Sequence, residues 1–88
     1  MPRKHIIVSG RVQGGGFRNH ACRLANTHQL TGWVRNLNSG DVELEVQGYS
    51  KNIEDFLSGL GKGSFFIHIE ELLIDDCKEV PESEFGIK

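Results

Sequence analysis

Residues 41–47 alternate strictly between polar and apolar side chains, and this alternation constrains the fold more than any other feature of the chain. Every second residue, beginning at position 42, is apolar, which is typical of a strand buried on one face. The turn sequence Asn-Ser-Gly at residues 38–40 separates this strand from another extended segment, residues 30–36. We therefore predict an antiparallel β-hairpin. The polar residues of its second strand are expected to point into solvent: Glu43, Glu45 and Gln47.

Other apolar patterns predict the remaining elements. Ser50 is expected to cap the second helix, and Gly61 and Gly63 are expected to end it. Glu70 and Glu71 interrupt the fourth strand, which predicts a β-bulge or an exposed edge with solvated side chains. In chain order, the remaining elements are expected at residues 4–12 (strand), 17–28 (helix), 50–60 (capped helix), 66–74 (strand) and 83–87 (short strand).

The resulting order is strand, helix, strand, strand, helix, strand, followed by a short fifth strand. This is the ferredoxin-like pattern, an α+β fold in which two helices cover one face of a mostly antiparallel sheet. With 88 residues, the chain is expected to form a single domain, residues 1–88. A domain of this size has little room for a large internal cavity, so we expect the functional site in a surface loop.

Three consecutive glycines separate the first strand from the first helix, where residues 10–18 read GRVQGGGFR. Glycine adopts positive φ and lets backbone N–H groups approach a ligand closely. Successive N–H groups and the positive end of a following helix bind anions, and Arg18 adds a planar fork of donors. The loop therefore predicts a phosphate-binding cradle. Because no Gly-Lys-Ser/Thr sequence follows, a P-loop nucleotide hydrolase is excluded.

The formal net charge of −2 argues against a general nucleic-acid binder. Six of the ten Lys and Arg residues lie in the first 35 positions, so an anion is expected to bind in the amino-terminal half. No apolar run reaches the roughly 20 residues that span a bilayer. Cys22 and Cys77 lack metal-ligand spacing, and reduced cysteines are favoured over a single bridge. We expect a cytoplasmic monomer with no metal and no nucleic-acid or membrane partner.

Three blocks of the sequence, GRVQGGGFR, LTGWVRNLNSGDVE and SEFGIK, resemble the acylphosphatase family. The resemblance covers nearly the whole chain without a large insertion. It implies a small enzyme that hydrolyses carboxyl phosphates to a carboxylate and inorganic phosphate. It also implies that the enzyme uses neither a metal nor a cofactor, and that its partner is a small-molecule acyl phosphate.

The same resemblance assigns the residues of the site. Arg18 matches the catalytic arginine of the family, and Asn36 matches its catalytic asparagine, which is expected to orient the attacking water. The phosphoryl group is expected to lie in the loop between the first strand and the first helix. The phosphate-binding residues that the resemblance implies are Gln13, Gly14, Gly15, Gly16, Phe17 and Arg18.

Gly15 stands where the family usually has a bulky or apolar residue. The alternative function is therefore a non-catalytic module of the same fold that binds an anion without turning it over. Three glycines in a row also raise the entropy cost of ordering the loop by roughly 1 kcal/mol per residue, which predicts a slower enzyme. His20 lies one helical turn from the loop and is expected to have only a minor effect on the local potential.

Overall fold

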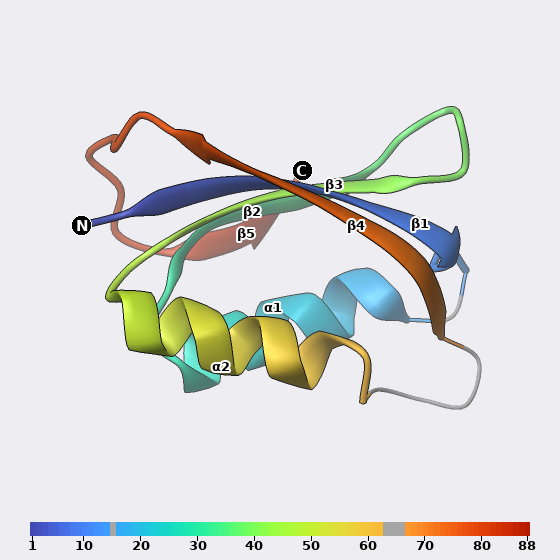
Figure 1. Ribbon diagram of the computed structural model, residues 1–88, viewed down its shortest axis with the longest axis horizontal. Coiled ribbons are helices and arrows are strands. Elements are labelled where there is room, and N and C mark those ends of the chain that lie inside the picture. Colours follow the sequence, from blue (N-terminus) through green and yellow to red (C-terminus); the bar gives the residue numbers. More distant parts are fainter. Residues whose placement is uncertain (15, 63–66) are drawn as a thin grey trace.

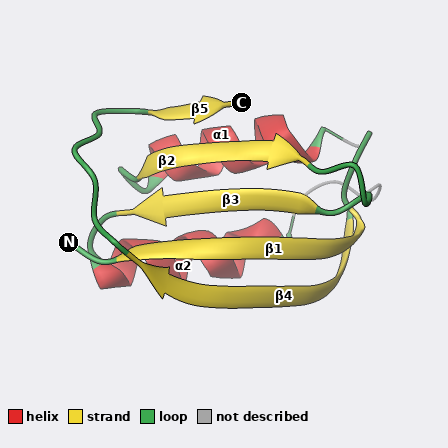
Figure 2. Ribbon diagram, turned by 90° about the horizontal axis from the view of Figure 1, so that it is seen from above, coloured by secondary structure: helices red, strands yellow, loops and turns green. Residues whose placement is uncertain are grey.

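The computed structural model describes residues 1–14, 16–62 and 67–88. Within them the elements are, in chain order, β1 (Arg3–Arg11), α1 (Phe17–Thr27), β2 (Thr31–Asn36), β3 (Val42–Gln47), α2 (Ser50–Leu60), β4 (His68–Cys77) and β5 (Phe85–Ile87). The strands form one sheet in the order β4-β1-β3-β2-β5, so β4 and β5 are its edges (Figure 2). All neighbouring strands are antiparallel except β2 and β5. Both helices cover the same face of the sheet (Figure 1).

This arrangement confirms the predicted ferredoxin-like α+β fold. Most element bounds agree with the sequence-based prediction to within one or two residues. β4 differs more: it was expected at residues 66–74, but it continues to Cys77 because its last residues pair with the beginning of β1. Position 66 lies outside the described residues. Within the described residues, neither helix is long and apolar enough to cross a membrane.

A β-bulge interrupts the pairing of β1 with β4. Ser9 pairs with Glu71 and Gly10 with Ile69, which leaves Glu70 as the extra residue. Gly10 has a φ of +129°, and a Cβ atom at this position would lie 2.2 Å from the carbonyl oxygen of His68. Only glycine fits there without a shift of the backbone. The expected bulge is confirmed, and so is the exposed edge, since β4 is an outer strand.

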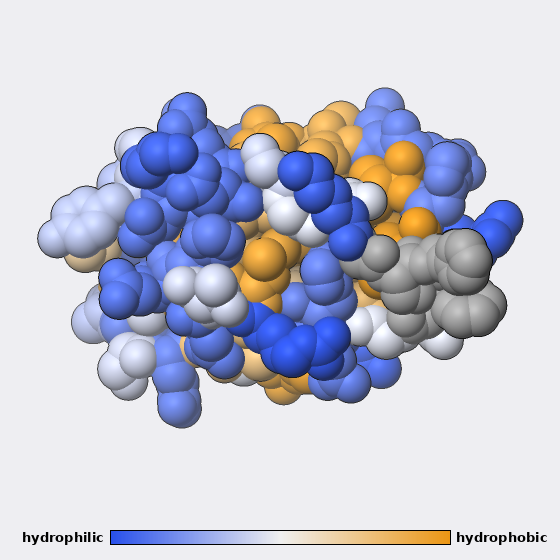
Figure 3. Space-filling model, turned by 90° about the horizontal axis from the view of Figure 1, so that it is seen from below, coloured by the Kyte–Doolittle hydropathy of each residue, from blue (hydrophilic) through white to orange (hydrophobic). Residues whose placement is uncertain are grey.

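The core lies between the sheet and the two helices. The apolar residues expected on the inner faces of β1 and β3 are fully buried there, and Ala21 and Ala25 of α1 pack against them. Ile53, Phe56 and Leu60 form the buried stripe of α2. Seen from the helix side, the surface is mostly hydrophilic, with hydrophobic atoms showing in limited patches (Figure 3). One apolar layer therefore holds both helices to the sheet.

The beginning of α2 corrects one expectation. Tyr49, with an extended backbone (φ −65°, ψ 144°), is the N-cap residue, and Ser50 is the first residue of the helix. The backbone N–H of Ile53 donates to the carbonyl oxygen of Tyr49 at 3.0 Å, which fixes the first helical hydrogen bond. The predicted cap at Ser50 is therefore wrong by one residue, and no side chain among the described residues caps the beginning of this helix.

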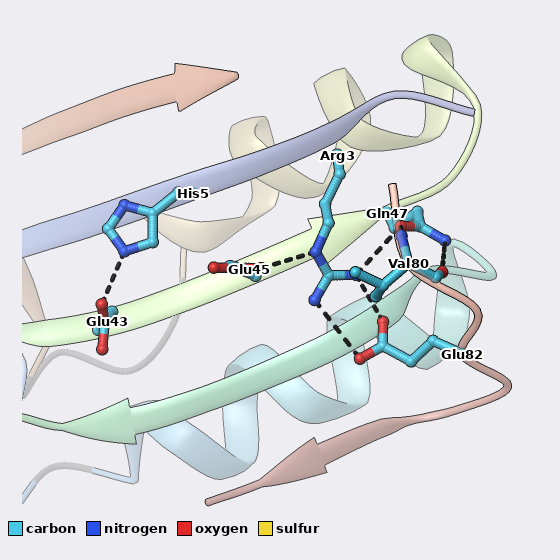
Figure 4. Close-up of polar contacts among 7 residues, drawn as sticks. All are labelled: Arg3, His5, Glu43, Glu45, Gln47, Val80 and Glu82. Atoms are coloured by element: carbon cyan, nitrogen blue, oxygen red, sulfur yellow. Dashed lines mark hydrogen bonds and ion pairs between the residues drawn. The ribbon is translucent and has the colours of Figure 1, made fainter. Parts of the chain in front are cut away.

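The uncovered face of the sheet carries ion pairs instead of solvated glutamates (Figure 4). Glu43 lies 2.7 Å from Nε2 of His5 and accepts a hydrogen bond from Arg35 Nε at 2.6 Å. Glu45 accepts from Arg3 Nε, also at 2.6 Å. The side chains of the two glutamates are only 15% and 23% exposed, so their expected solvation is wrong. The hydrogen bond from His5 lowers the pKa of Glu43, burial raises it, and the bond from Arg35 lowers it further, so that the net pKa is depressed.

Arg3 is the centre of a polar cluster formed by Arg3, Glu45, Gln47 and Glu82, which we call the Arg3 cluster (Figure 4). Arg3 is 3% exposed and donates to Glu82 at 2.7 Å and to Gln47 at 3.1 Å. Burial lowers the pKa of Arg3, but its bonds to Glu82 and Glu45 raise the pKa by more. Gln47 was expected to point into solvent and is instead 7% exposed.

The Arg3 cluster fixes the segment between β4 and β5 to the sheet. The side-chain amide of Gln47 donates to the carbonyl oxygen of Val80 at 2.8 Å and accepts from the Val80 N–H at 2.9 Å. This segment crosses from one edge of the sheet to the other (Figure 2). Gln47 is buried because the segment between β4 and β5 covers it. The alternation of polar and apolar residues in β3 cannot predict this long-range contact.

Arg3→Met should lower the free energy of unfolding by about 2 kcal/mol, because it leaves two carboxylates without their cation. The expected loss is below that of a fully buried pair, since Glu45 and Glu82 keep 23% and 22% of their side-chain surface exposed. Urea unfolding followed by Trp33 fluorescence measures the change. Lys4→Met is the matched control: Lys4 pairs with Asp76, whose side chain is 84% exposed, and should cost no more than about 0.5 kcal/mol. Equal losses in the two variants would contradict a special role for Arg3.

Candidate active site

A pocket of about 400 Å³ lies where β1, α1, β2 and β5 meet. Its described lining residues are Val12, Gly14, Gly16, Phe17, Arg18, Asn19, Asn36 and Ile87. They come from the loop after β1, the first turn of α1, the last residue of β2 and the last residue of β5. The fold therefore brings three separate segments of the chain, residues 12–19, Asn36 and Ile87, to one place.

The glycines in this loop are required by backbone conformation and not by crowding. Gly14 has a φ of +77° and Gly16 a φ of +80°, both in the left-handed region. Apart from its neighbours in the chain, a Cβ atom at either position would find no described atom within 4 Å, so the space beside the backbone is open there. Gly15, which the sequence placed at the centre of the phosphate loop, lies outside the described residues. The described part of the loop is thus a backbone turn that faces free space, where a ligand has access to it.

The N-terminal end of α1 opens onto this pocket. Gly16 is the N-cap, and the first helical hydrogen bond runs from the His20 N–H to the Gly16 carbonyl oxygen at 2.9 Å. The backbone N–H groups of the first turn therefore have no acceptor within the helix. Within the described part of the chain no side chain caps them, and the first turn contains no acidic residue. The positive end of the helix is available to an anion in the pocket.

Arg18 and Asn36 reach the pocket from different elements. Arg18 lies in the first turn of α1 with its side chain exposed. It is the one charged side chain among the described residues that line the pocket. Asn36 ends β2, opposite Val42 of β3, and its Oδ1 atom is buried without a hydrogen-bond partner among the described residues. The two side chains that the sequence singled out as catalytic therefore border the same space.

Gln13 has a different position from the other proposed loop residues. Its side-chain nitrogen donates to the carbonyl oxygens of Leu37 and Asp41, both at 2.8 Å. These carbonyls belong to the turn between β2 and β3, directly after Asn36. Gln13 does not line the described pocket, and its side chain instead connects the glycine loop to the strand end that carries Asn36.

Three residues of the pocket were not part of the predicted site: Val12, Asn19 and Ile87. The apolar pattern could identify Val12 and Ile87 as inward-facing, but only the sheet order places β5 beside β2. His20 lies elsewhere: its Nε2 is 3.3 Å from the carbonyl oxygens of Gly59 and Leu60, at the end of α2. Its ring therefore contacts the second helix.

The described residues contain no group of three or more His, Cys, Asp or Glu side chains placed to hold a metal ion. The hydrogen-bond donors in the described lining of the pocket are backbone N–H groups, the guanidinium of Arg18 and the amides of Asn19 and Asn36. All of these suit an oxyanion, and Asn36 can also act as an acceptor. The arrangement is chemically that of an anion site at a helix N-terminus.

A family model described as Acylphosphatase matches residues 4–87. The chain belongs to the acylphosphatase family. It is 41% identical to an acylphosphatase of Bacillus licheniformis over 80 residues, which cover 91% of this chain and 89% of the relative. It is also 41% identical to an acylphosphatase of Geobacillus thermodenitrificans over 88 residues, which cover 99% and 94% of the two chains.

A solved structure gives the same result. The crystal structure of acylphosphatase from Bacillus subtilis superimposes with a TM-score of 0.94 at 31% sequence identity, covering 100% of this chain and 99% of that one. The resemblance noted in the three sequence blocks is thereby confirmed. The chain is an enzyme of the acylphosphatase class, a family whose activity is the hydrolysis of acyl phosphates.

Proposed function

We propose that the chain hydrolyses small acyl phosphates in this pocket without a metal ion. A water molecule attacks phosphorus, the bond between phosphorus and the acyl oxygen breaks, and a carboxylate and inorganic phosphate leave. The observation that carries the proposal is the meeting of the glycine loop, the uncapped end of α1, Arg18 and Asn36 around one space. These groups can position a phosphoryl group and stabilise its charge, which are the main requirements of phosphoryl transfer.

Arg18 and the backbone N–H groups have the role of holding the phosphoryl oxygens. The guanidinium offers two parallel donors to a tetrahedral oxyanion, and the helix N-terminus adds fixed dipoles. Donors that are already in place need not reorganise as charge spreads over the phosphoryl oxygens, so they stabilise the transition state efficiently. The described lining contains no carboxylate that would repel the substrate.

Asn36 has the role of orienting the water. A neutral amide both donates and accepts hydrogen bonds, and it does not repel a phosphoryl dianion as a carboxylate would. A buried polar atom without a partner is uncommon and costs free energy, so the unpaired Oδ1 of Asn36 supports a functional role. The carboxylate leaving group needs little acid assistance. A phosphoryl oxygen of the substrate serves as the proton acceptor, so no histidine base is required.

We further propose that one copy of the chain is sufficient for this reaction. The described residues at the pocket bring together backbone N–H groups, Arg18 and Asn36. They already supply the donors for the phosphoryl group and the amide for the water. The chain would therefore act as a monomer on a small-molecule substrate.

Removal of metal ions should leave the rate unchanged. The test measures release of inorganic phosphate from acetyl phosphate before and after exhaustive dialysis against EDTA, with added Mg²⁺ as a control. The expected rates agree within experimental error, because every proposed contact is made by the protein. A rate that falls after dialysis and returns with Mg²⁺ would contradict the mechanism. Binding of inorganic phosphate with no hydrolysis of acetyl phosphate would favour the non-catalytic module instead.

A further inference from the structure

Ile87 is more exposed than its place in the fold predicts. Ile87 lies on β5, opposite Val34 of β2. β5 runs parallel to β2 at the edge of the sheet (Figure 2). Phe85, two residues earlier on the same face of the same strand, is 6% exposed, whereas Ile87 is 45% exposed. Ile87 is the last residue of this edge strand and borders the open pocket. An apolar side chain is thus presented to the space in which the substrate is proposed to bind.

The pocket is larger than a phosphate group requires. Four phosphate oxygens, each comparable to a water molecule that needs about 10–15 Å³ of such space, fill well under half of the 400 Å³. The loop and Arg18 account for the polar side of this space. The remainder must hold the other half of an acyl phosphate, its acyl group.

Apart from the amide of Asn19, the walls that remain for the acyl group are apolar. Val12 and Phe17 are each 1% exposed and form the floor, so Ile87 is the apolar side chain with surface left to cover. Arg18, the one charge in the described lining, is already committed to the phosphoryl group. The next residue, Lys88, lies on the other face of the sheet, with its Nζ atom 4.2 Å from the centroid of the Trp33 ring. No described cation at the pocket is therefore left for a charged acyl group.

We infer that Ile87 contacts the acyl group of the substrate and selects acyl phosphates whose acyl group is apolar and uncharged. The inference rests on the proposed function, because it assigns the phosphoryl group to the loop and leaves the acyl group to β5. Covering Ile87 with an apolar acyl group removes its surface from water and favours binding. An acyl group with a second carboxylate would lose hydration at the same place without gaining a partner.

The experiment compares kcat/KM for benzoyl phosphate, acetyl phosphate and monosuccinyl phosphate in the wild type and in Ile87 variants. Ile87→Ala should reduce the ratio of benzoyl to acetyl phosphate by about fivefold. Ile87→Leu should keep that ratio within about twofold, because it restores the apolar volume. Ile87→Lys should raise kcat/KM for monosuccinyl phosphate relative to acetyl phosphate. The inhibition constant of inorganic phosphate should stay the same in Ile87→Ala, since phosphate binds at the loop.

Leu73→Ala is the matched control. Leu73 on β4 is 51% exposed and is not among the pocket residues, so its loss should leave all three substrates unaffected. An unchanged benzoyl-to-acetyl ratio in Ile87→Ala, with hydrolysis still dependent on Arg18, would overturn this inference alone. So would an equal loss for every substrate together with weaker inhibition by phosphate, because that pattern indicates a structural role. A wild-type protein without Arg18-dependent hydrolysis would overturn the proposed function itself, and this inference with it.

Discussion

Arg18→Ala is expected to lower kcat/KM for acetyl phosphate by about 10²–10³-fold, the usual cost of removing one donor that stabilises transition-state charge. The loss should be this large because Arg18 is the one charged group in the described lining of the pocket. Arg18→Lys should recover only part of the activity, since an ammonium keeps the charge but lacks the planar fork that fits two phosphoryl oxygens. Steady-state release of inorganic phosphate measures both effects.

The matched control for this variant is Arg23→Ala. Arg23 is another exposed arginine on α1, but it does not line the pocket, so its removal should leave kcat/KM within about twofold. Neither substitution should change the free energy of unfolding by more than about 0.5 kcal/mol, because both side chains are exposed. A decrease of less than threefold in Arg18→Ala, or an equal decrease in Arg23→Ala, would contradict the proposed role of Arg18.

Asn36→Ala is expected to lower kcat by about 10²-fold while the inhibition constant of inorganic phosphate changes by no more than about threefold. The two quantities should separate because Asn36 is proposed to hold the water and not the phosphoryl group. Stability should change little, since the buried Oδ1 of Asn36 makes no hydrogen bond within the described chain that the substitution could break. Kinetics and phosphate inhibition, measured side by side, test the separation.

Asn36→Asp provides a sharper comparison. It keeps the shape of the side chain but places a carboxylate beside the phosphoryl group, so it should weaken phosphate inhibition as well as turnover. Asn38→Ala, an exposed residue in the turn between β2 and β3, is the control and should behave as the wild type. If Asn36→Ala lost turnover and phosphate affinity by the same factor, the water-orienting role would be wrong and Asn36 would be a phosphate ligand.

The features that could be predicted from the sequence are those with a local cause. The alternation in β3 gave its inward face, and the helical spacing of apolar residues gave the buried stripe of α2, because side-chain direction follows the period of each element. Glu70 and Glu71 interrupt the apolar alternation of β4, and this local irregularity predicts the bulge. The prediction of Ser50 as the N-cap is wrong although serine is favoured at N-cap positions. The residue with extended backbone that precedes the helix is Tyr49.

The features that could not be predicted join distant parts of the chain. Arg3 donates a hydrogen bond to Glu82, which is 79 residues away in the sequence. The periodicity of apolar residues does not predict such a contact. The sequence of β3 alone predicts a solvated Glu45, because the arginine that pairs with it lies on another strand. The candidate site shows the same difference between local features and long-range contacts. Arg18 was identified through a motif, whereas Ile87 enters the pocket only because β5 returns to lie beside β2.

Gln13 and the Arg3 cluster fix two different segments of the chain at opposite ends of the sheet. Gln13 anchors the glycine loop to the turn after β2, and this anchor does not involve residues 78–88. Val80 and Glu82 are held by Gln47 and Arg3 at the opposite end of the sheet, whereas residues 85–87 pair with β2. Under the proposed role of Ile87, substitutions near it change which carboxylic acid derivative is accepted, whereas the contacts of Gln13 beside the proposed phosphate loop are kept.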